Sequence, residues 1–250
     1  MLKSLLHGKP KAKRGEKRAV RRELLAVEGA DVAVNVRLNP RARRIVMRVN
    51  PATGEVTVTA PSRGGTAPAL AFARGETQWI ARQLKRMPAP VALVPGAVVP
   101  FLGVSHLIRH SPARGPAPVW TEKGAILFSG RMEHAPRRLT DFFKREARSL
   151  LAACALDYAA RLGARPARVS VRDTLSRWGS CSQSGSLSFS WRLIFTPDFV
   201  RDYVVAHEVA HLKEMNHSPR FWAHVKTLSP DAARARQWLR DHGRGLLRYN

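Results

Sequence analysis

The sequence of this chain predicts an α+β protein, in which a small β-rich N-terminal part precedes a C-terminal core built around a histidine-bearing helix. Three observations lead to this prediction. Near the N-terminus, apolar residues alternate with polar ones, which is typical of half-buried strands. From residue 137 to residue 162, apolar residues recur at helical spacing. Further along, an apolar segment contains the sequence His207-Glu208-Val209-Ala210-His211.

Changes of composition divide the chain into three predicted parts. Residues 1–22 are a basic, low-complexity arm that we expect to be disordered. Residues 23–130 form the β-rich part, which contains one helix, and residues 131–250 form the core. No apolar run approaches the length of a membrane span, and the basic start lacks the apolar stretch of a secretory signal. Two cysteines make no disulfide framework, so the sequence predicts a cytoplasmic protein without a membrane partner.

The β-rich part contains three runs in which apolar and polar residues alternate. The runs are 32–38, 45–49 and 56–58. Because turn residues separate the last two, we expect a three-stranded antiparallel meander. An amphipathic helix is predicted over residues 66–87, and short β segments over residues 97–128.

The core is expected to begin with the long helix at 137–162, which Gly163 ends. A strand that contains Val169 and Val171 follows. Residues 186–194 then alternate between apolar and polar side chains, as a half-buried strand does. The edge of such a strand can pair with an extended polypeptide, whose main chain adds to the sheet.

The helix of the histidine motif has its own start and stop signals. Thr196 is expected as its N-cap and Pro197 as its first residue. Asn216 tolerates a left-handed conformation and is expected to end it. Two further helices are predicted at 219–228 and 230–242, each after a serine cap.

The two histidines of the motif predict a metal site. Residues four apart lie on the same face of a helix, so His207 and His211 can share one Zn²⁺ at about 2.0–2.1 Å from each ring nitrogen. The metal lowers the pKa of a bound water to about 7, and the neighbouring carboxylate of Glu208 can then take the water's proton. We therefore predict Glu208 as the catalytic base.

A third histidine, His217, follows the motif by six residues. A turn at Asn216 would bring it back towards the metal, so His217 is the predicted third ligand. The alternative is that the two helix histidines and His217 are ordinary polar residues and Glu208 is solvated. Burying them within an apolar helix would then be costly without a metal or other partners, which favours the metal site.

The formal net charge of +25 suits a polyanionic partner. However, arginines are spread along the whole chain rather than clustered, and dispersed charge is weaker evidence than a patch. We expect nucleic-acid binding to be weak and non-specific.

Four stretches together resemble the YgjP-like metallopeptidase family. They are Arg177-Trp178-Gly179-Ser180-Cys181, Trp191-Arg192-Leu193-Ile194, the histidine motif, and His217-Ser218-Pro219-Arg220-Phe221-Trp222. The resemblance covers about residues 24–250 and implies a zincin-like core with His207, His211 and His217 as ligands and Glu208 as base. The last stretch is also similar to SprT-like and WLM proteases, which act on DNA-bound proteins. Ser190 is a departure, since family members commonly have asparagine there, and the role of the Trp178–Cys181 loop stays open.

The expected reaction is hydrolysis of peptide bonds in a polypeptide substrate. Two alternatives involve hydrolysis: a metal-dependent nucleotide phosphoanhydride hydrolase, which the basic charge favours although no glycine-rich phosphate loop is present, and a DNA-associated protease acting on DNA–protein crosslinks. A noncatalytic DNA-binding protein with a structural zinc is a third. Three ligands rather than four, with a glutamate placed as a base, argue against it.

Overall fold

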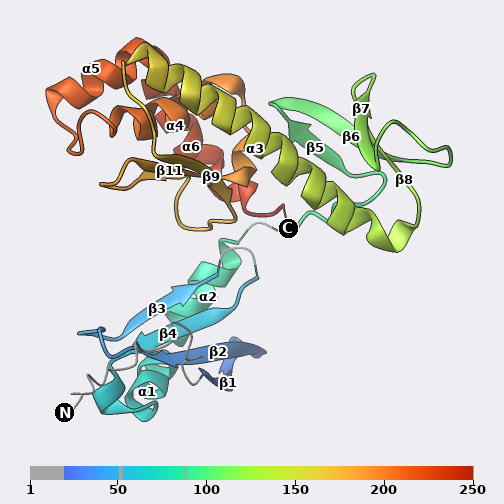
Figure 1. Cartoon of the computed structure of the whole chain (residues 1–250). Helices are drawn as coiled ribbons and strands as arrows, with labels where there is room; N and C mark the ends of the chain where they lie inside the picture. The colour runs from blue at the N-terminus through green and yellow to red at the C-terminus, as the bar shows by residue number, and fades with distance from the viewer. Residues whose placement is uncertain (1–19, 51–52, 88, 250) are drawn as a thin grey trace, which may run out of the picture. The chain divides into compact units, whose positions relative to one another are not determined.

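A computed structural model describes residues 20–50, 53–87 and 89–249 of the chain (Figure 1). The described chain forms two compact units, of which the first ends at Arg86 and the second begins at Met87. This division does not coincide with the predicted boundary between residues 130 and 131. Of the predicted basic arm, residues 1–19 lie outside the described residues, and residues 20–22 belong to a strand.

The first unit contains a four-stranded sheet with the order β1-β2-β4-β3. Its strands are β1 (Val20–Val27), β2 (Ala30–Leu38), β3 (Val46–Val49) and β4 (Val56–Ala60). The predicted three-stranded antiparallel meander is wrong in two respects: β1 is an additional strand, and β2 pairs with β4 in parallel. The charges of β1 obscure its alternation, and alternation identifies a strand without identifying its neighbour.

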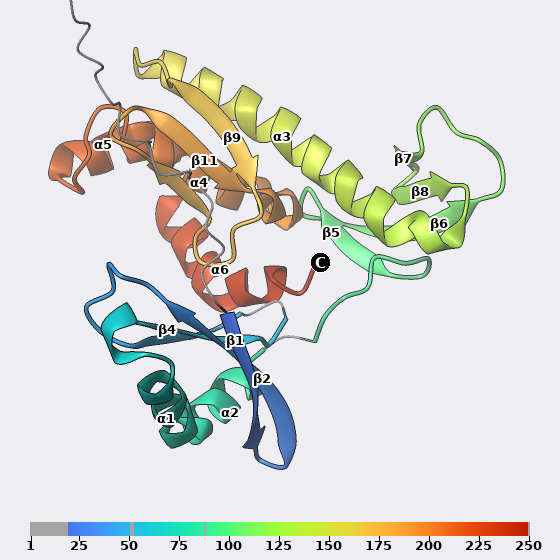
Figure 2. The ribbon, with the colours of Figure 1, turned by 60° about the horizontal axis from the view of Figure 1, so that its bottom comes forward.

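Two short helices cover one face of this sheet, as Figure 2 shows. They are α1 (Ala67–Gly75) and α2 (Thr77–Lys85), preceded by the 3₁₀ turn η1 (Ser62–Gly64). The predicted single helix at 66–87 is therefore broken at Gly75 and Glu76. Leu70 and Ile80 are buried together with Val36 and Val58 of the sheet, which gives the unit its own core.

The second unit begins with a sheet that packs on one end of a long helix (Figure 1). The sheet has the order β5-β6-β8-β7, and the helix is α3 (Ala135–Arg161). The strands are β5 (Val98–Phe101), β6 (Val104–Ser111), β7 (Val119–Glu122) and β8 (Ala125–Ser129), and the 3₁₀ turn η2 (Met132–His134) leads into the helix. The β segments predicted at 97–128 and the long helix are confirmed. Phe101 packs against Phe142 and Phe143, which joins sheet and helix.

A second sheet, of three strands, lies along the other part of α3. Its order is β10-β11-β9, and its strands are β9 (Arg168–Arg172), β10 (Gly179–Cys181) and β11 (Ser186–Ser190). The strand predicted at 186–194 ends at Ser190, because the next five residues form the buried 3₁₀ turn η3 (Trp191–Phe195). Since β11 lies in the centre of the sheet, the prediction that this strand offers an edge is wrong; β9 and β10 are the edges.

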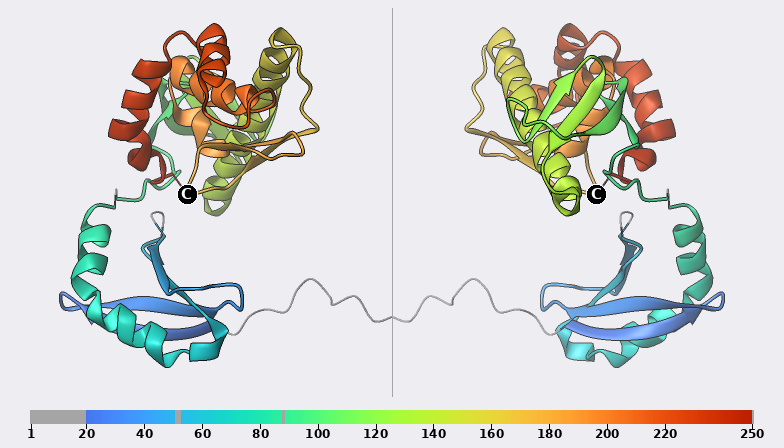
Figure 3. Two further views of the ribbon diagram at one scale, coloured as in Figure 1. Left: turned by 90° about the vertical axis from the view of Figure 1, so that its left-hand side faces the viewer. Right: turned by 90° about the vertical axis from the view of Figure 1, so that its right-hand side faces the viewer.

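Three helices complete the second unit: α4 (Asp198–Ala210), α5 (Pro219–Leu228) and α6 (Ala232–Leu246). Figure 3 shows α4, which carries the histidine motif, between α3 and α6. The predicted α+β class is confirmed. None of the helices in the described parts of the chain is long and apolar enough to cross a membrane.

The ends of these helices differ in part from the predicted ones. The N-cap of α4 is Pro197 instead of Thr196, whose hydroxyl donates to the carbonyl of Leu193 at 2.7 Å. The helix ends at Ala210, before the predicted Asn216. Ser218 caps α5 as predicted, by accepting a hydrogen bond from the backbone N–H of Phe221 at 3.3 Å.

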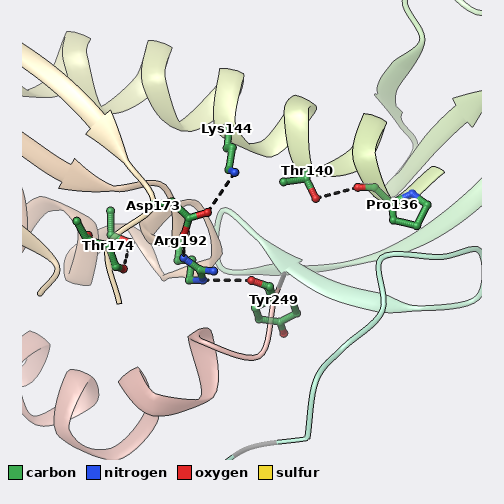
Figure 4. Close-up of polar contacts among 8 residues, drawn as sticks. Pro136, Thr140, Lys144, Asp173, Thr174, Arg192 and Tyr249 are labelled. Atoms are coloured by element: carbon green, nitrogen blue, oxygen red, sulfur yellow. Dashed lines mark hydrogen bonds and ion pairs between the residues drawn. The ribbon is translucent and has the colours of Figure 1, made fainter. Parts of the chain in front are cut away.

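A buried arginine ties the C-terminus to the centre of the second unit (Figure 4). The Arg192 side chain is 3% exposed and forms an ion pair with Asp173, while its Nε donates to the carbonyl of Tyr249 at 3.1 Å. Lys144 of α3 also approaches Asp173, at 3.2 Å. Burial would raise the pKa of Asp173, but the hydrogen bond and charge of Arg192 outweigh it and hold the pKa below its usual value. The network therefore depends on an ionised Asp173.

We expect Asp173→Asn to lower the free energy of unfolding by about 2 kcal/mol, because a buried guanidinium then loses its charged acceptor. This loss of stability is smaller than for a fully buried ion pair, because about half of the Asp173 side chain is exposed. Chemical denaturation followed by tryptophan fluorescence reports mainly on the second unit, which contains every tryptophan except Trp79. The matched control is Asp157→Asn, which removes an exposed ion pair with Arg161 and should cost under about 1 kcal/mol. An equal loss in both variants would contradict the structural role of the network.

Candidate metal centre

The structure brings together the three histidines that the sequence singled out. His207 lies in the last turn of α4, His211 is its C-cap, and His217 stands in the turn before α5. One ring nitrogen of each lies within 4.8 Å of the others. The Nε2 atoms of His207 and His217 are 3.3 Å apart. Two nitrogens bound to one tetrahedral Zn²⁺ at 2.0–2.1 Å are separated by about 3.3 Å, so this spacing fits a shared metal ion.

The turn that returns His217 to the helix is built from local hydrogen bonds. After Ala210 the chain leaves the helix, and the side-chain oxygen of Asn216 accepts a hydrogen bond from the backbone N–H of Ser218 at 3.1 Å. Ser218 then caps α5. Asn216 thus helps to position His217, although the helix has already ended six residues earlier.

The protonation of the histidines suits metal binding, which needs neutral imidazoles. Burial, together with the charges of His211 and His217, lowers the pKa of His207 to about 4. Burial also lowers the pKa of His211. The Nδ1–H of His211 donates to the carbonyl of Glu214 at 3.0 Å, which leaves its Nε2 with a free lone pair. In metal-binding histidines, a contact of this kind fixes the orientation of the ring.

Two aromatic residues of α5 enclose the cluster. The ring of Phe221 is fully buried and lies 4.9, 4.5 and 4.7 Å from the rings of His207, His211 and His217. The ring of Trp222 stacks on His217 at 5.9 Å. Phe221 therefore packs against all three histidines. The sequence does not show this contact, because Phe221 there resembles any apolar residue of an amphipathic helix.

Phe221→Ala should weaken zinc binding by about 10- to 100-fold, as the loss of outer contacts around a metal site does. The cavity should also cost about 3–5 kcal/mol of stability. Equilibrium zinc titration against a competing chelator separates the two effects when it is run well below the unfolding temperature. Val225→Ala, in the same helix and also fully buried, is the control for cavity formation. Equal zinc affinity in the Phe221 and Val225 variants would contradict the positioning role.

Glu208 lies on the neighbouring face of α4 and is only 8% exposed. Burial raises its pKa to about 7, against the opposing charge of Arg177 and a hydrogen bond from the backbone N–H of Cys181. A carboxyl group with a pKa near neutrality can accept and return a proton at physiological pH. Gly179 of β10 lies directly against the Glu208 side chain. A Cβ added at Gly179 would lie 2.5 Å from Cγ and 2.7 Å from Oε1 of the glutamate.

The Trp178–Cys181 loop, whose role the sequence left open, thus forms a wall of the site. Its last three residues are the edge strand β10, which pairs with β11. The buried Ser190 anchors it, since the Ser190 backbone N–H donates to the carbonyl of Trp178 at 2.8 Å. The Ser190 hydroxyl donates to the carbonyl of Thr174 at 3.4 Å.

Cys181 does not belong to the cluster of possible metal ligands, which among the described residues consists of the three histidines. Burial, with a further contribution from Glu208, raises the pKa of the Cys181 thiol.

A pocket of about 320 Å³ opens beside His207 and Glu208. Its walls come from β10, α4 and α6. The lining residues include Trp178, Gly179, Tyr203, Leu239, Arg236 and Arg240. The α6 residues were not among the predicted site residues, because nothing in the sequence shows that this helix packs beside the histidine motif.

The comparison with protein families agrees with this geometry. The YgjP-like metallopeptidase domain matches residues 43–242, which include every residue of the site described above. The chain belongs to this family. The predicted resemblance is confirmed, and as a YgjP-like protein the chain is a metallopeptidase, a hydrolase that uses a metal ion.

This YgjP-like chain also has a partial likeness to a solved structure. The crystal structure of the metallopeptidase zymogen of Pyrococcus abyssi abylysin aligns with this chain at 23% sequence identity and a TM-score of 0.31. The alignment covers 35% of this chain and 86% of abylysin. No curated protein matches the chain.

Proposed function

We propose that this protein is a zinc-dependent metallopeptidase, in which His207, His211 and His217 hold Zn²⁺ and Glu208 is the general base. The observation that carries the proposal is the convergence of the three ring nitrogens, with the 3.3 Å spacing of two of them, directly beside a buried carboxyl group. Three nitrogen ligands leave one position of a tetrahedral ion open, as in catalytic zinc sites. A bound Zn²⁺ supplies Lewis acidity, which polarises a carbonyl and lowers the pKa of water.

The protein's own groups then carry out the proton transfers. Glu208 takes a proton from the attacking water and, with a pKa near 7, returns it to the amine that leaves. Gly179 gives the carboxyl group room, and the half-buried Trp178 helps to exclude water from one side of the pocket. We further propose that an extended polypeptide pairs with the edge strand β10, which takes over the role first assigned to residues 186–194.

A second candidate, a nucleotide phosphoanhydride hydrolase, is favoured by one specific observation. Arg236 and Arg240 line the pocket beside Glu208, and guanidinium groups bind phosphates well. Peptides are favoured instead, because the sequence has no glycine-rich phosphate loop and the chain belongs to a metallopeptidase family.

A DNA-associated protease is a variant of the first candidate. For it we propose only weak, non-specific nucleic-acid binding, because the arginines are dispersed along the chain. A cytoplasmic location fits two cysteines that are both free.

The test uses the full chain loaded with one equivalent of Zn²⁺ and offers three substrates separately: an unfolded protein, nucleoside triphosphates and a DNA–protein conjugate. We expect cleavage of the unfolded protein without DNA, and loss of cleavage after chelation. Release of pyrophosphate or phosphate from nucleotides, with no peptide cleaved, would replace the peptidase by the second candidate. Cleavage that requires added DNA would move the assignment to proteases of DNA–protein crosslinks.

A further inference from the structure

Two arginines of α6 line the pocket that opens beside His207 and Glu208. Arg236 and Arg240 are four residues apart, so they lie on one face of the helix. Both line the pocket together with His207 and Glu208, and between them Leu239 contributes an apolar wall. The indole of Trp178 also lines the pocket and packs close to Gly243 of α6. The pocket therefore combines apolar sides with two guanidinium groups.

Neither arginine has an acidic partner among the described residues. The guanidinium of Arg236 lies over the ring of Trp222 at 5.3 Å, and that of Arg240 donates to the side-chain oxygen of Gln237. The nearby carboxylate of Asp241 accepts two hydrogen bonds from Gln237, each of 2.9 Å. Two like charges one turn apart on a helix repel each other. Both arginines are exposed, so water solvates their charges and their remaining N–H donors are open to a ligand.

An anion in the pocket could replace this water and pair with both guanidinium groups. The planar guanidinium presents donors in a fork that matches a carboxylate, and charge-assisted hydrogen bonds of this kind are the strong ones. A pocket of about 320 Å³ holds one side chain or chain end rather than a folded partner. Its position beside Glu208 places the anion next to the bond that is cleaved.

We propose that Arg236 and Arg240 form a subsite for a substrate carboxylate, so that the enzyme prefers peptides with an acidic residue or a free C-terminus next to the scissile bond. This inference rests on the proposed peptidase function and adds the class of substrate. The carboxylate can come from two sources: the side chain of an Asp or Glu residue, or the main-chain carboxylate at the end of the peptide.

The experiment compares matched peptides with the zinc-loaded full chain. One pair differs by Glu against Gln at a single position next to the cleaved bond, and a second pair differs by a free against an amidated C-terminus. We expect kcat/KM to favour the carboxylate member of one pair by about 10-fold or more, the size of one or two charge-assisted hydrogen bonds. The pair that shows the preference identifies the source of the carboxylate.

The decisive variant is Arg240→Gln, because Arg236 also influences His207 through its charge. In this variant the ratio between the two peptides should fall towards one. Arg244→Gln removes the same charge from an exposed site of the same helix outside the pocket, and should leave the ratio and the rate as in the wild type. Arg240→Glu should reverse the preference in favour of a Lys peptide, an outcome that misfolding cannot produce.

Binding of the same peptides to the Glu208→Gln variant is measured by calorimetry, so that the subsite is tested without turnover. Tighter binding of the carboxylate peptide, lost with Arg240→Gln, supports the subsite even where no peptide is cleaved; failure of cleavage alone contradicts the proposed function. Equal affinity for the Glu and Gln peptides and for both chain ends would overturn the subsite. So would a preference that Arg240→Gln leaves intact.

Discussion

Glu208→Gln is expected to reduce peptide hydrolysis by about 100-fold or more while zinc stays bound. The amide keeps the size of the side chain but cannot accept a proton from water. Glu208 is buried and its pKa is raised to about 7, which suits a group that accepts and returns a proton at neutral pH. The measurement is kcat/KM on the unfolded-protein substrate, accompanied by the zinc content of the same sample.

The control for this variant is Glu214→Gln, which is close to the site in the sequence and half-buried, and whose backbone carbonyl rather than side chain contacts His211. It should keep both activity and zinc. Undiminished hydrolysis in Glu208→Gln would remove the residue from the mechanism. Loss of zinc and of the fold, to the same degree as activity, would make Glu208 structural.

Gly179→Ala is expected to lower activity by about 100-fold, because displacement of a catalytic group by about 1 Å has effects of this size. The added methyl group would lie 2.5 Å from Cγ and 2.8 Å from Cδ of Glu208, closer than such atoms approach one another. Either β10 or the carboxyl group must move. The backbone of Gly179 does not have a positive φ, so an alanine is otherwise tolerated there and the effect comes from the collision alone.

Gly245→Ala is the matched control, since nothing lies within 4 Å of the added Cβ and its φ is not positive. We expect it to have wild-type activity. Circular dichroism and zinc content should be normal in both glycine variants. If Gly179→Ala were as active as Gly245→Ala, the close approach of β10 to Glu208 would not be part of the working site.

The parts of the site that are continuous in sequence could be predicted, and those that depend on packing could not. The i, i+4 histidines and the capped start of α5 are local features, and His217 returns to them over only six residues. Arg236 and Arg240 belong to a helix more than twenty residues away. They enter the pocket because α6 packs beside α4, and no local pattern encodes that contact.

The fold shows the same distinction. The 27-residue helix α3 is an amphipathic element whose period is evident from the sequence. By contrast, the alternating residues of β2 and β4 indicate strands but not that the two are parallel neighbours. Residues 186–194 read as one strand because Leu193 continues the alternation, yet burial of all of Trp191–Phe195 favours a 3₁₀ turn after Ser190. Tertiary packing overrides the local pattern at that point.

Zinc binding by the full chain tests the central claim most directly. Titration of the metal-free protein against a competing chelator should give one Zn²⁺ per chain. His207→Ala, His211→Ala and His217→Ala should each weaken binding by more than about 100-fold, beyond the effect of losing an outer contact. His224→Ala, on α5 but outside the cluster, should bind as the wild type does. Wild-type affinity and stoichiometry in any of the three cluster variants would contradict the proposed metal centre.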